Sequence, residues 1–126
     1  MNNNESMEMY LKTVFILENS HGHAHGVDIA KRLGVSKPSV TKAVRYLKDQ
    51  GFVNTQKYGT ITLTEKGREV SESIYNNHQL LELFLKHSLD LSAEEAGMNA
   101  CRIEHIMSDK MIEAIIGYLK KNSITL

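Results

Sequence analysis

One short stretch with a period of two interrupts a chain whose apolar residues otherwise recur every three or four positions. In this stretch, residues 52–56 and 61–63 flank the turn sequence Tyr58-Gly59-Thr60. A period of two is typical of a β-strand, and spacings of three and four are typical of an amphipathic helix. The pattern therefore predicts a mainly α fold that contains one small β-hairpin.

Three helices are predicted before the hairpin. The first covers about residues 5–20, and the second covers residues 27–33 and ends at Gly34. Ser36 is a candidate N-cap for the third helix, and Pro38 is tolerated in the first turn of that helix. Short helix, glycine turn, helix and hairpin in this order form a winged helix-turn-helix.

Three further helices are predicted after the hairpin. A long helix runs over about residues 65–88. Ser92 and Glu95 form a capping box that begins a fifth helix, and Ser108 and Asp109 begin the last one. A chain of 126 residues is most simply one domain or two small ones, and we place a boundary after residue 70.

Charge is unevenly distributed along a chain whose formal net charge is zero. From Gly26 to Val70 there are nine basic and four acidic residues, whereas from Ser71 onwards there are five basic and eight acidic ones. A basic block inside a neutral protein indicates a localised surface for a polyanion.

The basic block coincides with the predicted winged helix-turn-helix. In such motifs the second helix enters the major groove of DNA, where small hydrogen-bonding and basic side chains contact bases and phosphates. The candidate DNA-binding residues are Ser36, Lys37, Pro38, Ser39, Thr41, Lys42 and Arg45, with Lys57 in the wing. Helix-turn-helix patterns also occur in proteins that do not bind DNA, but the charge segregation and the hairpin favour DNA binding.

The sequence also bears on the compartment. A single cysteine cannot form an internal disulfide, which favours a reducing environment, and we expect a cytoplasmic protein. Apolar runs are only a few residues long, and residues 1–5 do not resemble a signal peptide. We therefore expect no contact with a membrane.

Cys101, Glu104 and His105 place a thiol, a carboxylate and an imidazole at helical positions i, i+3 and i+4, on one face. These donors suit a divalent first-row transition metal better than calcium or magnesium. The pattern alone is weak, because a lone cysteine is usually a small apolar residue. A thiol-based redox sensor remains an alternative. A metal-dependent hydrolase is disfavoured because no second carboxylate or nucleophile accompanies the cluster, so we predict that the protein is not an enzyme.

Segments along the whole chain carry a resemblance to a known family. They are residues 7–11, 29–33, 40–41, 63–68, 78–82 and, most specifically, 100–109, which contain Cys101-Arg102-Ile103-Glu104-His105. In these segments the chain resembles the diphtheria-toxin-repressor family of metal-dependent transcriptional repressors, which has iron- and manganese-responsive members.

The resemblance implies two domains: a winged helix-turn-helix DNA-binding domain at residues 1–70 and a helical metal-binding and dimerisation domain at residues 71–126. It further implies a homodimer that binds a double-stranded DNA operator and has no small organic substrate. Because the chain ends at Leu126, we expect the two-domain form without the SH3-like domain.

The resemblance also implies the metal ligands. The primary site would consist of Met9, Cys101, Glu104 and His105, with Met9 delivered by the N-terminal helix. An ancillary site would use His78 and Glu82, although His78 also fits a core histidine on the apolar seam of its helix. The third helical ligand of the ancillary site, a histidine in relatives, falls at Gly97.

Ligand type indicates which metal is bound. Manganese-selective relatives have carboxylates at the positions of Met9 and Cys101 and a second acid at the position of Lys12. Thioether and thiolate are softer donors, so Fe²⁺ is the first choice and Mn²⁺ the alternative. Co²⁺, Ni²⁺ or Zn²⁺ would substitute for them in vitro.

The histidine-rich tract His21-Gly22-His23-Ala24-His25 falls in the predicted turn after the first helix. Exposed polar residues are expected in such a turn. We therefore assign no metal site to this tract from the sequence.

Overall fold

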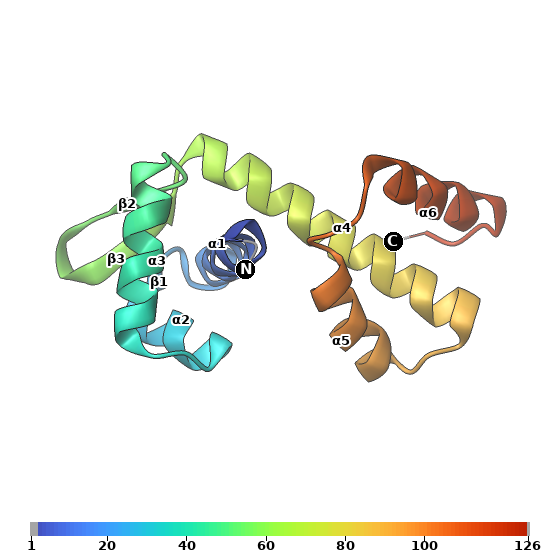
Figure 1. Cartoon of the computed structure of the whole chain (residues 1–126), viewed down its shortest axis with the longest axis horizontal. Coiled ribbons are helices and arrows are strands. Elements are labelled where there is room, and N and C mark those ends of the chain that lie inside the picture. The colour runs from blue at the N-terminus through green and yellow to red at the C-terminus, as the bar shows by residue number, and fades with distance from the viewer. Residues whose placement is uncertain (1–2, 126) are drawn as a thin grey trace. The chain divides into compact units, whose positions relative to one another are not determined.

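Helices dominate the part of the chain that the structure describes. The computed structural model describes the backbone of residues 3–125 and the side chains of residues 5–125. The chain divides into two compact units, which we call the N-terminal unit (up to Glu72) and the C-terminal unit (from Ser73). The boundary falls inside helix α4 (Glu65–Leu89), two residues after the predicted one (Figure 1).

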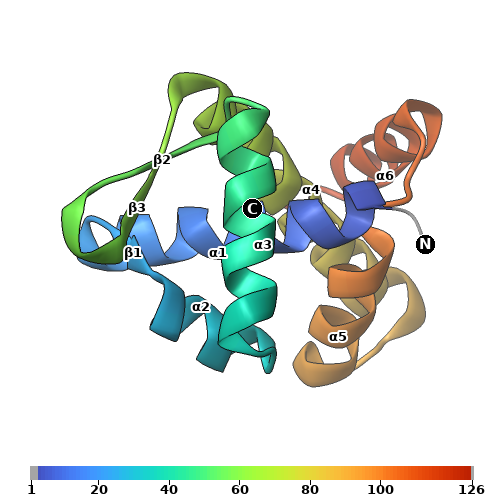
Figure 2. The same cartoon turned by 60° about the vertical axis from the view of Figure 1, so that its left-hand side comes forward.

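The N-terminal unit has three helices and a small sheet before α4. In chain order they are α1 (Asn3–His21), β1 (Ala24–His25), α2 (Gly26–Leu33), α3 (Lys37–Asp49), β2 (Val53–Thr55), the 3-10 turn η1 (Lys57–Gly59) and β3 (Thr60–Leu63). The strands are antiparallel in the order β1-β3-β2, with Val53 opposite Leu63. Figure 2 shows α1 crossing behind α3, with the β2–β3 hairpin beside them. This is the predicted winged helix-turn-helix.

One strand was not predicted. β1 lies where the sequence predicts only a turn, and it pairs with β3 so that Ala24 faces Ile61. Two residues are too short to show a period, so the sequence carries no signal for this strand. The side chain of Ala24 is completely buried, which anchors the strand against the core.

Buried aliphatic side chains from every layer form the core of the N-terminal unit. Val14 of α1, Ile29 of α2, Leu47 of α3 and Val53 of β2 are each at most 1% exposed. Full burial of one such side chain stabilises the folded state by about 1.5–3 kcal/mol. The core therefore fixes α3 by one face and leaves its opposite face to solvent.

Gly67 is required by a close approach between the first turn of α4 and the backbone of Phe52, the residue before β2. A Cβ atom at this position would lie 1.9 Å from the carbonyl oxygen of Phe52. That oxygen accepts a hydrogen bond from the backbone N–H of Thr64 at 3.0 Å, which holds it in place. Only glycine fits here.

The C-terminal unit packs the rest of α4 against α5 (Ala93–Ile103) and α6 (Asp109–Lys121). Its core consists of Leu81, Leu85, Ala96, Ala100, Ile115 and Leu119. The predicted caps are present: Ser92 Oγ accepts the N–H of Glu95 at 3.1 Å, and Ser108 Oγ accepts that of Met111 at 3.1 Å.

Helix α5 ends earlier than the sequence pattern implied. Its last residue is Ile103, so Glu104 is the C-cap and His105 lies in the following turn. Glu104 keeps helical dihedral angles, and its N–H bonds to Ala100 O.

None of the described helices combines the length and apolar character needed to cross a membrane.

Candidate nucleic-acid interface and metal centre

Helix α3 presents the predicted DNA-binding residues on its solvent face. Its inner face is buried through Val40, Ala43, Val44 and Leu47. The predicted residues are all exposed: Ser36, Lys37, Pro38, Ser39, Thr41, Lys42 and Arg45, with Lys57 in η1. The helix therefore offers a basic, hydroxyl-rich start to a large partner while its other face is held by the core.

Local hydrogen bonds define the start of α3. Ser36 Oγ accepts the N–H of Ser39 at 3.3 Å and lies 2.9 Å from the hydroxyl of Ser39. The hydroxyl of Thr41 donates to the carbonyl of Lys37 at 3.1 Å. Capping fixes the first turn, where the backbone N–H groups and the helix dipole favour an anion such as a DNA phosphate.

The wing continues this surface. Lys48 of α3 donates to the hydroxyl of Thr55 on β2 at 2.9 Å, which ties the helix to the hairpin. A hollow of about 380 Å³ lies between them, and Thr41, Arg45 and Lys48 are among its lining residues. At the tip, Tyr58 is 94% exposed and has a φ of 68°. An exposed aromatic residue in the left-handed region is uncommon, so Tyr58 is a contact candidate in the predicted wing.

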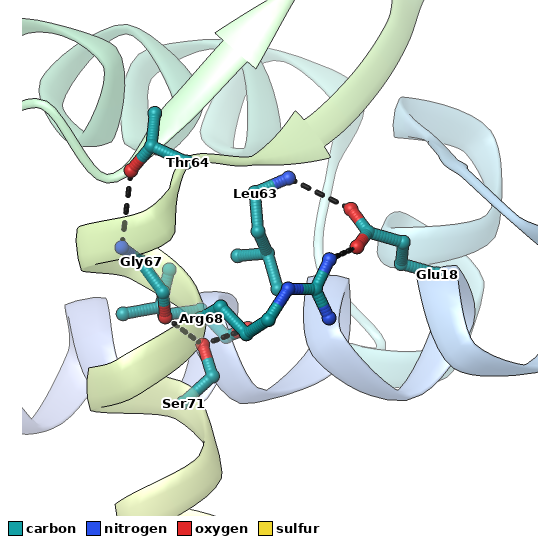
Figure 3. A network of polar contacts seen from close by, with 7 residues as sticks. Glu18, Leu63, Thr64, Gly67, Arg68 and Ser71 are labelled. Atoms are coloured by element: carbon teal, nitrogen blue, oxygen red, sulfur yellow. Dashed lines mark hydrogen bonds and ion pairs between the residues drawn. The ribbon is translucent and has the colours of Figure 1, made fainter.

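Glu18 connects the wing to two helices (Figure 3). One carboxylate oxygen accepts the backbone N–H of Leu63 on β3 at 2.8 Å. The other contacts the guanidinium group of Arg68 on α4. The Glu18 side chain is only 10% exposed. Sequence reasoning missed this residue because its main partner is a backbone group 45 positions away.

Ser71 adds a second contact in the same region (Figure 3). Its hydroxyl group is completely buried and donates to the carbonyl of Gly67 at 2.7 Å. The oxygen also lies 3.4 Å from the carbonyl oxygen of Leu11 on α1. The first turns of α4 therefore help to hold α1 and the wing together. We call this set of contacts, made by Glu18, Ser71 and the first turns of α4 around Gly67, the frame.

In the C-terminal unit, Glu104 lies between two imidazoles. Its Oε2 is 2.8 Å from His78 Nδ1, and its Oε1 is 3.2 Å from His105 Nε2. The other ring nitrogen of His78 is 3.2 Å from Glu82 Oε2. We call Glu82, His78, Glu104 and His105 the carboxylate–imidazole chain. It joins residues that the family resemblance assigned to two separate metal sites.

The carboxylate–imidazole chain is fully buried at one end and partly exposed at the other. The side chains of Glu104 and His105 are both 0% exposed, whereas those of His78 and Glu82 are 18% and 33% exposed. Burying ionisable groups is costly unless they are paired or bound to a metal. Two ligand atoms that each lie about 2.1 Å from one ion at right angles are about 3 Å apart. Each of the three distances, 2.8–3.2 Å, is therefore compatible with two neighbouring ligands of a divalent ion. Because the two ring nitrogens of His78 point apart, Glu82 and Glu104 cannot share one ion with His78.

The other predicted ligands are placed as follows. Cys101 is half-buried on α5, one helical turn before Glu104, and forms no disulfide. Met9 is half-buried on α1 and belongs to the N-terminal unit, so its membership of the site stays a prediction. Among the described residues, no three His, Cys, Asp or Glu side chains already stand in a metal-holding arrangement. A metal would therefore replace the present contacts between carboxylate and imidazole.

Gly97 bears on the predicted ancillary pair. A Cβ atom on Gly97 would lie 3.9 Å from Glu82 Oε2. A side chain at position 97 would therefore begin beside this carboxylate, where the resemblance places a histidine ligand. Glycine supplies no donor there, so this chain offers one ligand fewer for an ion at His78 and Glu82.

Two family models match the chain. Residues 4–61 match the iron-dependent repressor N-terminal DNA-binding domain. Residues 64–124 match the iron-dependent repressor metal-binding and dimerisation domain.

Similar curated proteins include three regulators. The HTH-type transcriptional regulator MJ0568 of Methanocaldococcus jannaschii is 31% identical over 93% of this chain and 94% of its own length. MntR of Geobacillus kaustophilus is 36% identical over 87% of this chain and 77% of its own length. The iron-dependent repressor IdeR of Mycobacterium tuberculosis is 32% identical over 91% of this chain. The chain spans about half the length of that repressor, 50%.

Solved structures show the same fold. IdeR of T. acidophilum superposes with a TM-score of 0.82 at 26% identity, over 90% of this chain and 53% of that one. The manganese regulator SloR gives a TM-score of 0.80 at 32% identity, over 90% of this chain and 53% of that one.

Proposed function

This chain belongs to the family of iron-dependent repressors, and we propose that it represses transcription when it binds a divalent metal. It would act in the cytoplasm as a homodimer on a double-stranded DNA operator. Residues 1–70 would bind DNA, and residues 71–126 would bind the metal and dimerise. The observation that carries the metal half of the proposal is the buried Glu104 carboxylate, which lies between two imidazoles at distances suited to neighbouring ligands.

The DNA half of the proposal rests on α3. Its exposed face carries Lys37, Lys42 and Arg45, and its capped N-terminus favours a phosphate. A homodimer would present two such helices to paired half-sites one helical turn apart. Lys57 and Tyr58 of η1 would then lie against the sugar–phosphate backbone beside the groove.

The metal half of the proposal uses the donors of both units. Met9, Cys101, Glu104 and His105 would form the primary site, and His78 with Glu82 would form the ancillary one. A bound divalent ion supplies the positive charge that holds carboxylates and neutral imidazoles on one centre. Because Met9 lies on α1 and the other three ligands follow α4, ligation would couple the two units. Metal activates the protein only if it binds the DNA-competent state more tightly than the inactive state, because only that difference in affinity shifts the population.

The donor types favour Fe²⁺ over Mn²⁺. Carboxylate and imidazole suit both ions, whereas the sulfur atoms of Met9 and Cys101 favour the softer one. Relatives of both kinds exist, since IdeR is an iron-dependent repressor and SloR a manganese regulator. Co²⁺, Ni²⁺ and Zn²⁺ would substitute in vitro.

An anaerobic DNA-binding titration tests the proposal. Random-sequence duplexes are first selected with the full-length protein, with and without Fe²⁺, to obtain the operator. We expect metal to raise operator affinity about 5- to 150-fold, the usual range of such coupling. The double variant Met9→Asp/Cys101→Glu is expected to prefer Mn²⁺. Glu94→Gln, which removes an exposed charge on α5, is the matched control and is expected to behave as wild type.

Two outcomes would contradict the proposal. Operator binding that is unchanged by any divalent metal would exclude metal activation. Binding that responds to an oxidant, ignores Fe²⁺ and Mn²⁺, and loses this response in Cys101→Ala would instead establish the thiol-based alternative.

A further inference from the structure

Three histidines cluster where α1, β1 and α2 meet, outside the sites described above. His21 ends α1, His23 lies in the following bend and His25 is the last residue of β1. The sequence placed all three in a turn, where side-chain directions are not fixed. In the structure β1 pairs with β3, and His25 lies opposite Thr60. This pairing fixes the direction of the side chains around Ala24.

The imidazole rings of His23 and His25 lie side by side at the start of β1. Side chains of neighbouring residues in a strand point to opposite faces. Ala24 is 0% exposed and points into the core. His25, the neighbour of Ala24 in β1, therefore points away from the core, and the ring of His23, in the bend before the strand, lies beside it: the ring centroids are 4.7 Å apart with the ring planes at 81°.

This spacing matches two ligands of one ion. A ring nitrogen binds a metal such as Zn²⁺ at about 2.0–2.1 Å, and two imidazoles at right angles or tetrahedral angles around it then have centres about 5 Å apart. We propose that His23 and His25 form a two-histidine chelate for a divalent transition-metal ion, separate from the regulatory site. Two protein ligands leave the remaining coordination positions to water.

The surrounding hollow has room for these waters. It measures about 660 Å³ and is lined by His21, His23 and His25 together with Leu17, Asp28, Lys31 and Arg32. The described residues provide no third protein ligand in position, so the bound ion stays accessible to solvent. Such a site exchanges its ion more readily than a closed structural one.

The charges around the hollow disfavour a cation overall. Lys31 and Arg32 oppose a cation, and the carboxylate of Asp28 offsets one of these charges. Affinity must then come from the bonds between metal and imidazole, which strengthen from Mn²⁺ and Fe²⁺ towards Ni²⁺ and Cu²⁺. The chelate is therefore expected to bind Cu²⁺, Ni²⁺ or Zn²⁺ more tightly than Fe²⁺ or Mn²⁺.

Stoichiometry tests the chelate in the full-length protein. We expect calorimetric titration with NiCl₂ to show one equivalent fewer in His23→Ala/His25→Ala than in wild type. His87→Ala, an exposed histidine on α4, is the control for loss of an imidazole elsewhere. His21→Ala controls for the same tract, and both controls are expected to keep the wild-type stoichiometry.

The single variant His23→Ala separates chelation from folding, because His23 is exposed and lies outside β1. Removing one arm of a chelate is expected to lower Ni²⁺ affinity at this site about tenfold or more. With Cu²⁺, electron paramagnetic resonance is expected to show two imidazole nitrogens in wild type and one in His23→Ala. Equal Ni²⁺ stoichiometry in wild type and the double variant would overturn the proposal. A loss in His21→Ala as large as in His23→Ala would overturn the two-ligand assignment.

Discussion

Two carboxylates with little or no exposure, one in each unit, have contrasting partners. Glu18 contacts a backbone N–H and a guanidinium group. Glu104 contacts two imidazole rings. The partners of Glu18, an amide N–H and a guanidinium group, are hydrogen-bond donors that do not bind metals, whereas the nitrogen of a neutral imidazole is a common metal ligand. Glu18 is therefore suited to a permanent structural contact, and Glu104 to contacts that are exchanged when a metal binds.

The two carboxylates also connect different structural elements. Glu18 joins α1, β3 and the start of α4, so its contacts hold the wing against these two helices (Figure 3). Glu104 joins the end of α5 to His78 in α4. We therefore expect changes in the frame to affect stability whether or not metal is present, and changes at Glu104 to affect the response to metal.

The largest effect is expected from Gly67→Ala in the frame. The new Cβ would lie 1.9 Å from the oxygen of Phe52 and 2.9 Å from its carbonyl carbon. Relieving such an overlap requires moving backbone, and we expect a loss of about 4 kcal/mol or more in unfolding free energy. Chemical denaturation of the metal-free protein measures this loss.

Gly117→Ala is the matched control in the C-terminal unit. Gly117 is exposed within α6, and its Cβ would meet nothing within 4 Å. Because alanine favours helix over glycine, we expect a gain of up to about 1 kcal/mol. Similar effects of both substitutions would contradict the close approach at Gly67.

The second effect concerns Glu104→Gln, which keeps the size of the side chain and removes its charge. We expect the variant to fold without metal but to lose most of the stabilisation by Fe²⁺, which for wild type reaches about 2.7 kcal/mol at 100 times the dissociation constant. Anaerobic thermal denaturation with and without Fe²⁺ measures the difference. A wild-type shift in melting temperature would remove Glu104 from the proposed metal site.

The third effect concerns Glu18→Gln, the equivalent change in the frame. Hydrogen bonds to charged groups contribute about 1.5–3 kcal/mol, so we expect a loss near 2 kcal/mol with and without metal. The stabilisation by Fe²⁺ is expected to stay as in wild type. A metal-dependent loss in this variant would mean that the two carboxylates do not have separate roles.

The sequence predicted those features that depend on near neighbours. The caps at Ser36, Ser92 and Ser108 and the exposed face of α3 were all predicted, because each is encoded within a few residues. β1 was missed because two residues are too short to show a period.

Contacts between distant segments were also missed. Sequence spacing identified Glu104 and His105 as donors, but His78 reaches Glu104 across 26 positions. Glu18 reaches Leu63 across 45 positions. Local pattern carries no information about which distant backbone or ring an acid will meet, so only the tertiary structure shows that these groups are joined.

The smallest effect compares two N-caps, one in each unit. Ser36 accepts the N–H of Ser39 at 3.3 Å, and Ser92 accepts that of Glu95 at 3.1 Å. Replacement by alanine is expected to cost about 1 kcal/mol of stability at either site. Ser36→Ala is also expected to weaken metal-loaded operator binding several-fold, because its hydroxyl lies at the proposed DNA surface, whereas Ser92→Ala leaves that affinity unchanged. Operator titration well below both melting temperatures measures this, and an equal loss in both variants would mean that affinity follows general stability rather than contact at α3.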